Sequence, residues 1–168
     1  MSEVSPFPSI PTKIQLPIDF SPSSKAALVM ATDLALHFHA ELFLVNVIPL
    51  LVMTTVDYSA PDISFPEKMK VYAEQQLAKI HAFLSSKGVR AISSIEVGND
   101  IAGSIMEVAD REHIDMVVIS THGISGWHPL IFGSIAEKVV KLAQCPLLLL
   151  RSAKPNPDLK TSSNRSME

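Results

Sequence analysis

Apolar and polar positions alternate along the chain in blocks that predict strands and helices in regular succession. Five short apolar runs have the length and composition of buried strands. They are Lys13–Ile18, Leu42–Ile48, Arg90–Val97, Asp115–Ser120 and Leu147–Leu150. Between these runs lie four segments whose apolar residues recur at helical spacing. This alternation of strand and helix predicts one parallel sheet with helices on both faces, which is an α/β fold.

Local signals mark the starts of two of the predicted helices. Ser21 is placed to cap the first helix, and Pro22 takes the first helical position, where its missing N–H would have no intrahelical partner. Ser134 and Glu137 have the spacing of a capping box, in which each side chain bonds a free backbone N–H at the helix start. We therefore expect Ser134 to open and cap the fourth helix. The residues of this helix expected to face inward are Ile135, Val139 and Leu142.

The 168 residues suffice for one domain, since domains commonly have about 100–200 residues. The composition is 47% hydrophobic and 18% charged, which suits a parallel sheet covered on both faces. We predict a single domain over residues 12–151, preceded by a flexible arm at residues 1–11 and followed by a polar, disordered tail at residues 152–168. The segment 49–66 has no periodicity and is expected to be a long loop.

Charge and targeting signals limit the possible classes of function. The net charge is −3, the pI is near 6.1 and no basic patch is visible, which argues against nucleic acid as a partner. The apolar runs are far shorter than the ~20 residues of a membrane span, and the chain starts without the features of a signal peptide. Cys145 is the single cysteine, which fits a reducing compartment. We therefore expect a cytoplasmic protein that does not bind membranes.

The segment after the fourth predicted strand carries the candidate chemistry. It holds Gly123, Gly126 and Gly133, followed by Ser134 at the start of a helix. Glycines let the backbone approach a phosphate, and a helix start offers unpaired N–H groups. The spacing matches neither G-x-x-x-x-G-K-[ST] nor G-x-G-x-x-G. We predict a phosphate site built from backbone N–H groups and hydroxyls; the alternative is that the glycines only shape the loop.

Asp19 is the second candidate, because it ends the first predicted strand. Ligands in such sheets bind at the carboxyl ends of the strands, where the strand order reverses. A reversal between the first and fourth strands would bring Asp19 to the glycine loop. Two interpretations of Asp19 stay open: a carboxylate favoured by the helix dipole, or a contact to a ribose hydroxyl or, through a metal ion, to phosphate.

The glycine loop contains no lysine or arginine, and His122 and His128 are its possible cations. Phosphoryl transfer needs charge neutralisation and an oriented nucleophile, and neither is evident here. The loop therefore favours holding a nucleotide over turning it over, and we assign no catalytic residue. The six histidines show no metal-ligand spacing, so no dedicated metal site is predicted.

Several segments of the chain resemble the universal stress protein family. They are K-I-Q-L-P-I-D-F-S at Lys13–Ser21, V-G-N-D-I-A-G-S-I-M-E-V-A at Val97–Ala109, S-T-H-G-I-S-G-W-H-P-L-I-F-G-S-I-A-E-K-V-V at Ser120–Val140 and C-P-L-L-L-L-R at Cys145–Arg151. The nucleotide-binding branch of the family has the pattern G-x2-G-x9-G-[S/T]. Gly123, Gly133 and Ser134 match this pattern, whereas Ser120 stands where the pattern has its first glycine.

The resemblance implies a sheet of order 3-2-1-4-5 and a bound adenine nucleotide, ATP or ADP or AMP, which magnesium could accompany. It implies base contacts near Pro17, Asp19 and Val47. The residues implied to line the ribose and phosphates are Ile119, Gly123, Gly133, Ser134 and Ile135, and Ser120, His122 and Gly126 of the same loop complete the predicted nucleotide-binding set. The resemblance also implies a homodimer formed through Leu147–Leu150.

The favoured hypothesis is a stress-response protein that binds an adenine nucleotide and acts as a sensor or regulator. The first alternative is a slow ATPase that uses Asp19 and a divalent metal ion. The second is a dimeric interaction protein of the same family that has lost its nucleotide, which Ser120 keeps open because its side chain would lie near the ribose–phosphate path.

Overall fold

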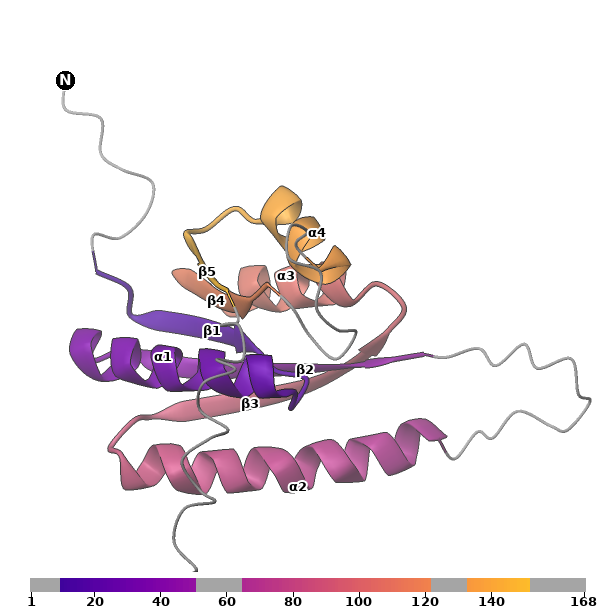
Figure 1. Cartoon of the computed structure of the whole chain (residues 1–168), viewed down its shortest axis with the longest axis horizontal. Helices are drawn as coiled ribbons and strands as arrows, with labels where there is room; N and C mark the ends of the chain where they lie inside the picture. The colour runs from indigo at the N-terminus through magenta and orange to yellow at the C-terminus, as the bar shows by residue number, and fades with distance from the viewer. Residues whose placement is uncertain (1–9, 51–64, 122–132, 152–168) are drawn as a thin grey trace, which may run out of the picture.

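The structure is a computed structural model that describes residues 10–50, 65–121 and 133–151. Strands and helices alternate in these residues as the hydrophobic pattern predicts (Figure 1). The strands are β1 (Lys13–Pro17), β2 (Glu41–Pro49), β3 (Ala91–Gly98), β4 (Met116–Ser120) and β5 (Leu147–Leu150). The helices are α1 (Pro22–Phe38), α2 (Phe65–Ser86), α3 (Ile101–Arg111) and α4 (Ser134–Leu142). The predicted arm and tail lie outside the described residues, apart from residues 10 and 11.

The five strands form one parallel sheet in the order β3-β2-β1-β4-β5, which confirms the predicted order. β1 lies at the centre, where Ile14 is opposite both Leu42 of β2 and Met116 of β4. The next strand along the chain therefore lies on one side of β1, and the last two strands lie on the other. The strand order reverses between β1 and β4, as the position of Asp19 and the glycine loop predicts.

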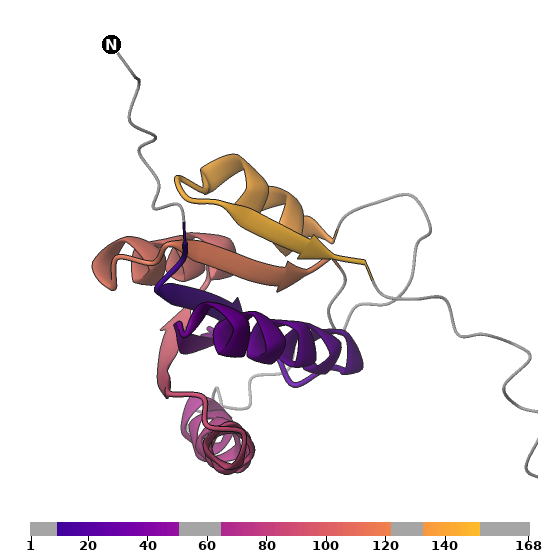
Figure 2. The ribbon, with the colours of Figure 1, turned by 90° about the vertical axis from the view of Figure 1, so that its left-hand side faces the viewer.

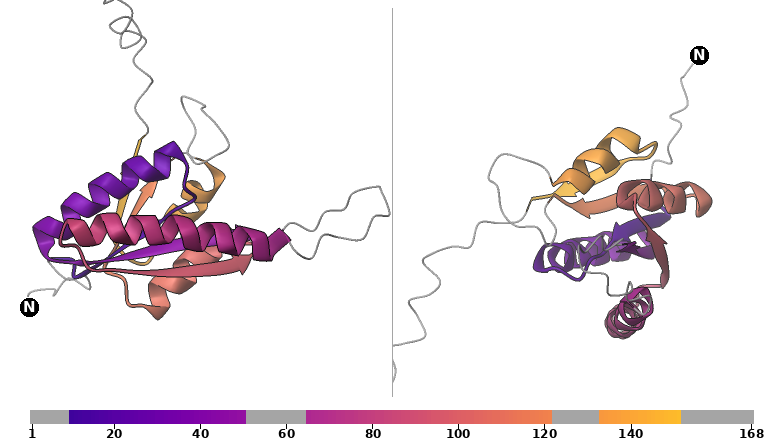
Figure 3. Two further views of the ribbon diagram at one scale, coloured as in Figure 1. Left: turned by 90° about the horizontal axis from the view of Figure 1, so that it is seen from below. Right: turned by 90° about the vertical axis from the view of Figure 1, so that its right-hand side faces the viewer.

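Two layers of helices cover the sheet. α1 and α2 pack on one face, and α3 and α4 pack on the other (Figures 2 and 3). Successive side chains of β1 point to opposite faces of the sheet. Ile14 and Leu16 are fully buried under α1 and α2. Gln15, between them, turns toward α3 and donates from Nε2 to the Ile105 carbonyl at 2.8 Å. None of the described helices is long and apolar enough to cross a membrane.

The connection between β2 and α2 is shorter than the loop predicted over residues 49–66. Pro49 is the last residue of β2, where it lies opposite Gly98, and α2 begins at Phe65. Pro66 therefore falls in the first turn of α2, a position that tolerates proline because its N–H would have no partner there. Residues 51–64 lie outside the described part of the chain.

The predicted caps have different outcomes. Ser21 caps α1, and its Oγ accepts from the Ser24 N–H at 3.2 Å, which confirms the prediction. The capping box at α4 is wrong, because the N-cap residue is Gly133 and no side chain bonds the free N–H groups there. The Glu137 N–H donates to the Gly133 carbonyl at 3.0 Å, so α4 opens at Ser134 as predicted, but Gly133 takes the cap position.

The inward face of α4 also differs from the prediction. Val139 is fully buried as expected, and Ala136 is buried beside it. Ile135 and Leu142 were expected to face inward, but they remain 39% and 42% exposed. The physical reason for Ile135 is that the first turn of α4 borders a pocket, so its side chain has no core partner on that side.

The central strand should dominate the stability of the sheet. Leu16→Ala should lower the free energy of unfolding by about 2–5 kcal/mol, because it removes fully buried methyl groups and leaves a cavity. Leu36→Ala on α1 is the matched control; Leu36 is 40% exposed, so its loss should cost less than about 1 kcal/mol. Urea denaturation of both variants measures the difference, and equal losses would contradict this account of the core.

Candidate functional site

A pocket lies at the carboxyl ends of β1 and β4, where the strand order reverses. The described residues enclose about 280 Å³ there. Its walls come from the ends of β1, β2 and β4 and from the first turns of α1, α3 and α4, and most of the lining is apolar. Such a pocket, apolar with a few polar groups, is the usual form of a small-molecule site.

The structure brings most of the predicted nucleotide-binding residues into this pocket. Those that line it are Pro17, Asp19, Val47, Ile119, Ser120, Gly133, Ser134 and Ile135. They come from three strand ends and one helix, and only the fold makes them neighbours. His122, Gly123 and Gly126 lie outside the described residues.

Asp19 occupies the β1 end of the pocket. Its Oδ1 accepts the Ser21 N–H at 3.0 Å, just ahead of the first turn of α1. Burial acts to raise the pKa of Asp19, but hydrogen bonds from the Ser21 and Ser24 side chains and from the Ser21 backbone outweigh burial and lower it. The carboxylate is therefore ionised at neutral pH and is a weak base. Its link to the start of α1 supports the helix-entry interpretation, and its place in the pocket leaves the ribose interpretation open.

Two neighbours of Asp19 hold it in place. Asn46 is buried, and its Nδ2 donates to the Ile18 carbonyl at 2.7 Å, which fixes the backbone immediately before Asp19. Phe20 follows Asp19 with a φ of 63°, a left-handed conformation that is rare for a residue with a side chain. The Phe20 ring packs edge-on against Tyr72 of α2 at 5.9 Å between centroids. The sharp turn at Phe20 sends its own ring toward α2 and leaves Asp19 facing the pocket.

The opposite wall is the start of α4. The Gly133 N–H donates to the Thr121 carbonyl at 2.7 Å, and the Thr121 N–H donates to the Leu150 carbonyl at 2.9 Å. These bonds fix the start of α4 against the ends of β4 and β5. Ser134 follows, exposed, as the first residue of the helix. Backbone N–H groups of the first turn carry the positive end of the helix dipole and suit an anion.

A third wall comes from residues that the sequence did not single out. Ile101 and Ile105 of α3 line the pocket, as do Ser24 of α1 and Thr121 after β4. The two isoleucines have helical spacing, and that pattern is the same for a core contact and for a ligand contact. One signal was available: α3 begins directly after β3, so its first turn must lie at the ligand-binding edge of the sheet.

The charges around the pocket set its chemistry. Asp19 is the single carboxylate of the described lining, and that lining holds no lysine, arginine or histidine. In the described part of the chain no three His, Cys, Asp or Glu side chains are grouped to hold a metal ion. The pocket can take a planar apolar group with an anionic extension toward α4. Its described lining lacks the paired nucleophile and base of a hydrolase.

The lowered pKa of Asp19 predicts a pH dependence of stability. The folded-state pKa lies below the ordinary 3.8, so the ionised carboxylate stabilises the fold fully above about pH 4, and this contribution is lost as the pH falls through the folded-state pKa. Asp19→Asn should therefore be less stable than the natural chain near neutral pH, and the gap should narrow on acidification. Urea denaturation of both proteins across this range measures it; a gap that widens toward low pH would refute the assignment.

Comparison with known proteins gives a consistent result. The sequence profile of the Universal stress protein family matches residues 11–151. A universal stress protein of Methanocaldococcus jannaschii is 28% identical over 142 residues, which are 84% of this chain and 83% of that protein. The structure of universal stress protein UspA from Lactobacillus plantarum is similar with a TM-score of 0.71 and 22% identity, over 83% of this chain and 97% of that one.

Two further structures of similar fold carry nucleotides. One is a universal stress protein in complex with cAMP, with a TM-score of 0.64 and 20% identity over 86% of this chain and 100% of that one. The other is a universal stress protein from Archaeoglobus fulgidus in complex with dAMP, with a TM-score of 0.60 and 18% identity over 82% of this chain and 96% of that one. With the family profile spanning all nine strands and helices described above, this chain belongs to the universal stress protein family.

Proposed function

We propose that the protein binds an adenine nucleotide in this pocket and acts as a sensor or regulator in a stress response. One observation carries the proposal: apolar walls meet a carboxylate at the end of β1 and a helix N-terminus at the start of α4. A purine needs an apolar slot, and a phosphate needs N–H donors. The enclosed volume of about 280 Å³ lies just below the usual range for ligand pockets, about 300–1,000 Å³.

The proposed pose follows the chemistry of the walls. The base lies near Pro17 and Val47, at the ends of neighbouring strands, and Asp19 accepts a hydrogen bond from the base or from a ribose hydroxyl. The phosphates lie toward Gly133 and Ser134. The other loop residues predicted for the phosphate path, His122, Gly123 and Gly126, belong to the same proposal.

The ligands of the two structural neighbours support the choice of nucleotide class. Both cAMP and dAMP carry an adenine base and a single phosphate. The common elements are therefore the base, a sugar and one phosphate, and these are the groups for which the described pocket has complementary walls. A longer phosphate chain would extend beyond them, past the first turn of α4.

The described pocket favours holding the nucleotide over hydrolysing it. A slow ATPase dependent on a divalent ion would have to rely on Asp19, because the described lining has no second carboxylate and no cation. Magnesium would then arrive with the nucleotide and not in a resident site. Phosphate release by the purified protein, compared with an Asp19→Ala variant, tests this rival, and equal rates would end it.

A homodimer through β5 is part of the proposal. β5 forms one edge of the sheet, and its four leucines are only partly buried. An apolar edge strand with unpaired backbone groups favours pairing with a second chain. This surface is also the basis of the second rival, a nucleotide-free interaction protein, for which Ser120 is the motivating feature. A cytoplasmic location is proposed with the same role.

Calorimetry tests the nucleotide directly. Nucleotide-free protein should bind AMP, ADP and ATP, and Gly133→Val should weaken all three at least about tenfold, because a branched side chain enters the pocket wall and valine is a poor N-cap residue. Ala82→Val, exposed on α2, adds the same side chain away from the pocket and should bind as the natural chain does. No binding at millimolar ligand would refute the proposal, and a cellular phenotype that survives Gly133→Val would favour the interaction protein.

A further inference from the structure

An ion pair joins the start of α3 to the second turn of α4, and both helices contribute residues to the pocket wall. Lys138 of α4 donates from Nζ to Oδ2 of Asp100 at 2.7 Å, and both side chains are about half exposed. Asp100 is the N-cap residue of α3, and its Oδ1 accepts the Gly103 N–H at 2.9 Å. The two partners are far apart in the sequence and meet because α3 and α4 pack side by side on one face of the sheet.

Both ends of this ion pair adjoin residues that line the pocket. Asp100 directly precedes Ile101, and Lys138 follows Ser134 by one helical turn, a spacing that places two side chains on the same face of a helix. The Lys138 backbone lies about 6 Å along the helix axis from that of Ser134. The ammonium group is therefore bound to the residue that directly precedes Ile101, on the same face of α4 as Ser134, and both Ile101 and Ser134 line the pocket.

The carboxylate that holds Lys138 is itself fixed. A Cβ atom on Gly103 would lie 2.7 Å from Asp100 Oδ2, so only glycine lets the carboxylate fold this closely over the start of α3. Lys138 and the Gly103 N–H together lower the pKa of Asp100, which keeps the carboxylate ionised at neutral pH. Lys138 is therefore held by the ionised Asp100 carboxylate, beside a pocket whose described lining has no cation of its own.

We propose that Lys138 is the phosphate-binding cation of the nucleotide site, and that it leaves Asp100 for the distal phosphates of a di- or triphosphate. This inference rests on the nucleotide-binding role proposed above. A polyphosphate carries more negative charge than one carboxylate, and a lysine ammonium can turn on its flexible stem from one acceptor to the other. An exposed ion pair contributes little to stability, so its rearrangement costs the fold little.

In this role Lys138 senses the length of the phosphate chain. Adenosine has no group for Lys138 to meet, and a single phosphate is held by the first turn of α4. ADP and ATP extend beyond that turn. Asp100 weakens the binding of ADP and ATP in two ways: it holds the Lys138 ammonium in an ion pair, and its negative charge repels the phosphates.

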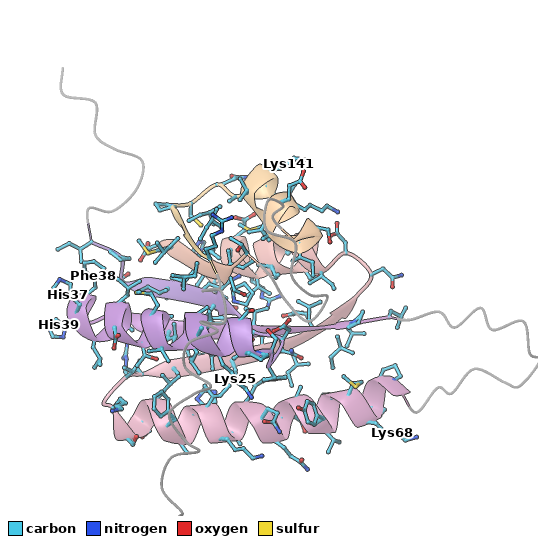
Figure 4. The ribbon with its side chains drawn as sticks, in the orientation of Figure 1. Lys25, His37, Phe38, His39, Lys68 and Lys141 are labelled. Carbon is cyan, nitrogen blue, oxygen red and sulfur yellow. The ribbon has the colours of Figure 1, made fainter. Side chains whose placement is uncertain are left out.

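The chain offers a matched control on the same helix. Lys141 donates to Oε1 of Glu137 at 2.7 Å, so the chemistry and length of this ion pair equal those of the Lys138 pair. Lys141 lies about 10 Å along the helix axis from Ser134, at the end of α4 away from the pocket. Figure 4 shows it on the side of α4 turned away from the sheet.

Calorimetric titration of adenosine, AMP, ADP and ATP into each variant tests the proposal. Lys138→Gln should lower the affinity for ATP about tenfold and leave the affinity for adenosine within about twofold. A tenfold loss is near the low end for a charged hydrogen bond, because Lys138 is open to water. Lys138→Arg should restore most of the ATP affinity. Lys141→Gln should leave every ligand unchanged. A loss of ATP affinity in Lys141→Gln equal to that in Lys138→Gln would overturn the proposal, since it would show only the net charge of the helix.

A second variant separates the transfer of Lys138 from a general charge effect. Asp100→Asn keeps an N-cap acceptor for Gly103 and removes the carboxylate charge. It should raise the affinity for ATP about threefold in the natural chain, and this gain should largely disappear when Lys138→Gln is also present. An equal gain in both backgrounds would overturn the transfer.

The outcomes also separate this inference from the proposed function. Adenosine and AMP that bind normally while Lys138→Gln has no effect on ADP or ATP would refute the role of Lys138 alone. A natural chain that binds none of the four ligands would refute the nucleotide site and this role together.

Discussion

The whole site depends on the parallel pairing of β1 with both β2 and β4. β2 pairs with the whole of β1, β4 pairs with its other edge at Ile14 and Gln15, and the three central residues of β1 are buried. The helices that follow β1 and β4 cover opposite faces of the sheet. The chain after β1 enters α1 on one face, and the chain after β4 leads to α4 on the other. The pocket lies at this end of the sheet between the starts of α1 and α4, where the strand order reverses.

The end of β1 shows how local strain and tertiary contacts are balanced. The positive φ of Phe20 costs about 1–3 kcal/mol, a value typical of a residue with a side chain in that region. The edge-on contact of its ring with Tyr72 contributes about 0.5–1.5 kcal/mol beyond burial and offsets part of the cost. The buried bond from Asn46 to the Ile18 carbonyl adds a further constraint. The strained turn persists because two other elements, α2 and β2, hold the residues around it.

Charged side chains are few in the pocket lining and more frequent around it. The described pocket wall is mostly apolar with one carboxylate, and Lys138 lies outside this lining, where it is paired with Asp100 of the neighbouring helix start. A mostly apolar pocket with a single carboxylate favours a ligand whose apolar part is buried and whose charged part reaches water. This arrangement agrees with the proposed sensor role, because charged contacts at the surface can change without disturbing the core.

The sequence by itself determined the element order, the α/β class and the residues of the two strand ends, because hydrophobic period, glycine and proline placement and the Ser21 cap are local signals. The family resemblance added the strand order. Only the tertiary structure decided that Gly133 caps α4 in place of Ser134, since the bond from its N–H to Thr121 requires β4 to be in place. Only the tertiary structure brought Lys138 to Asp100, because the packing of α4 beside α3 leaves no mark in the local pattern of either helix.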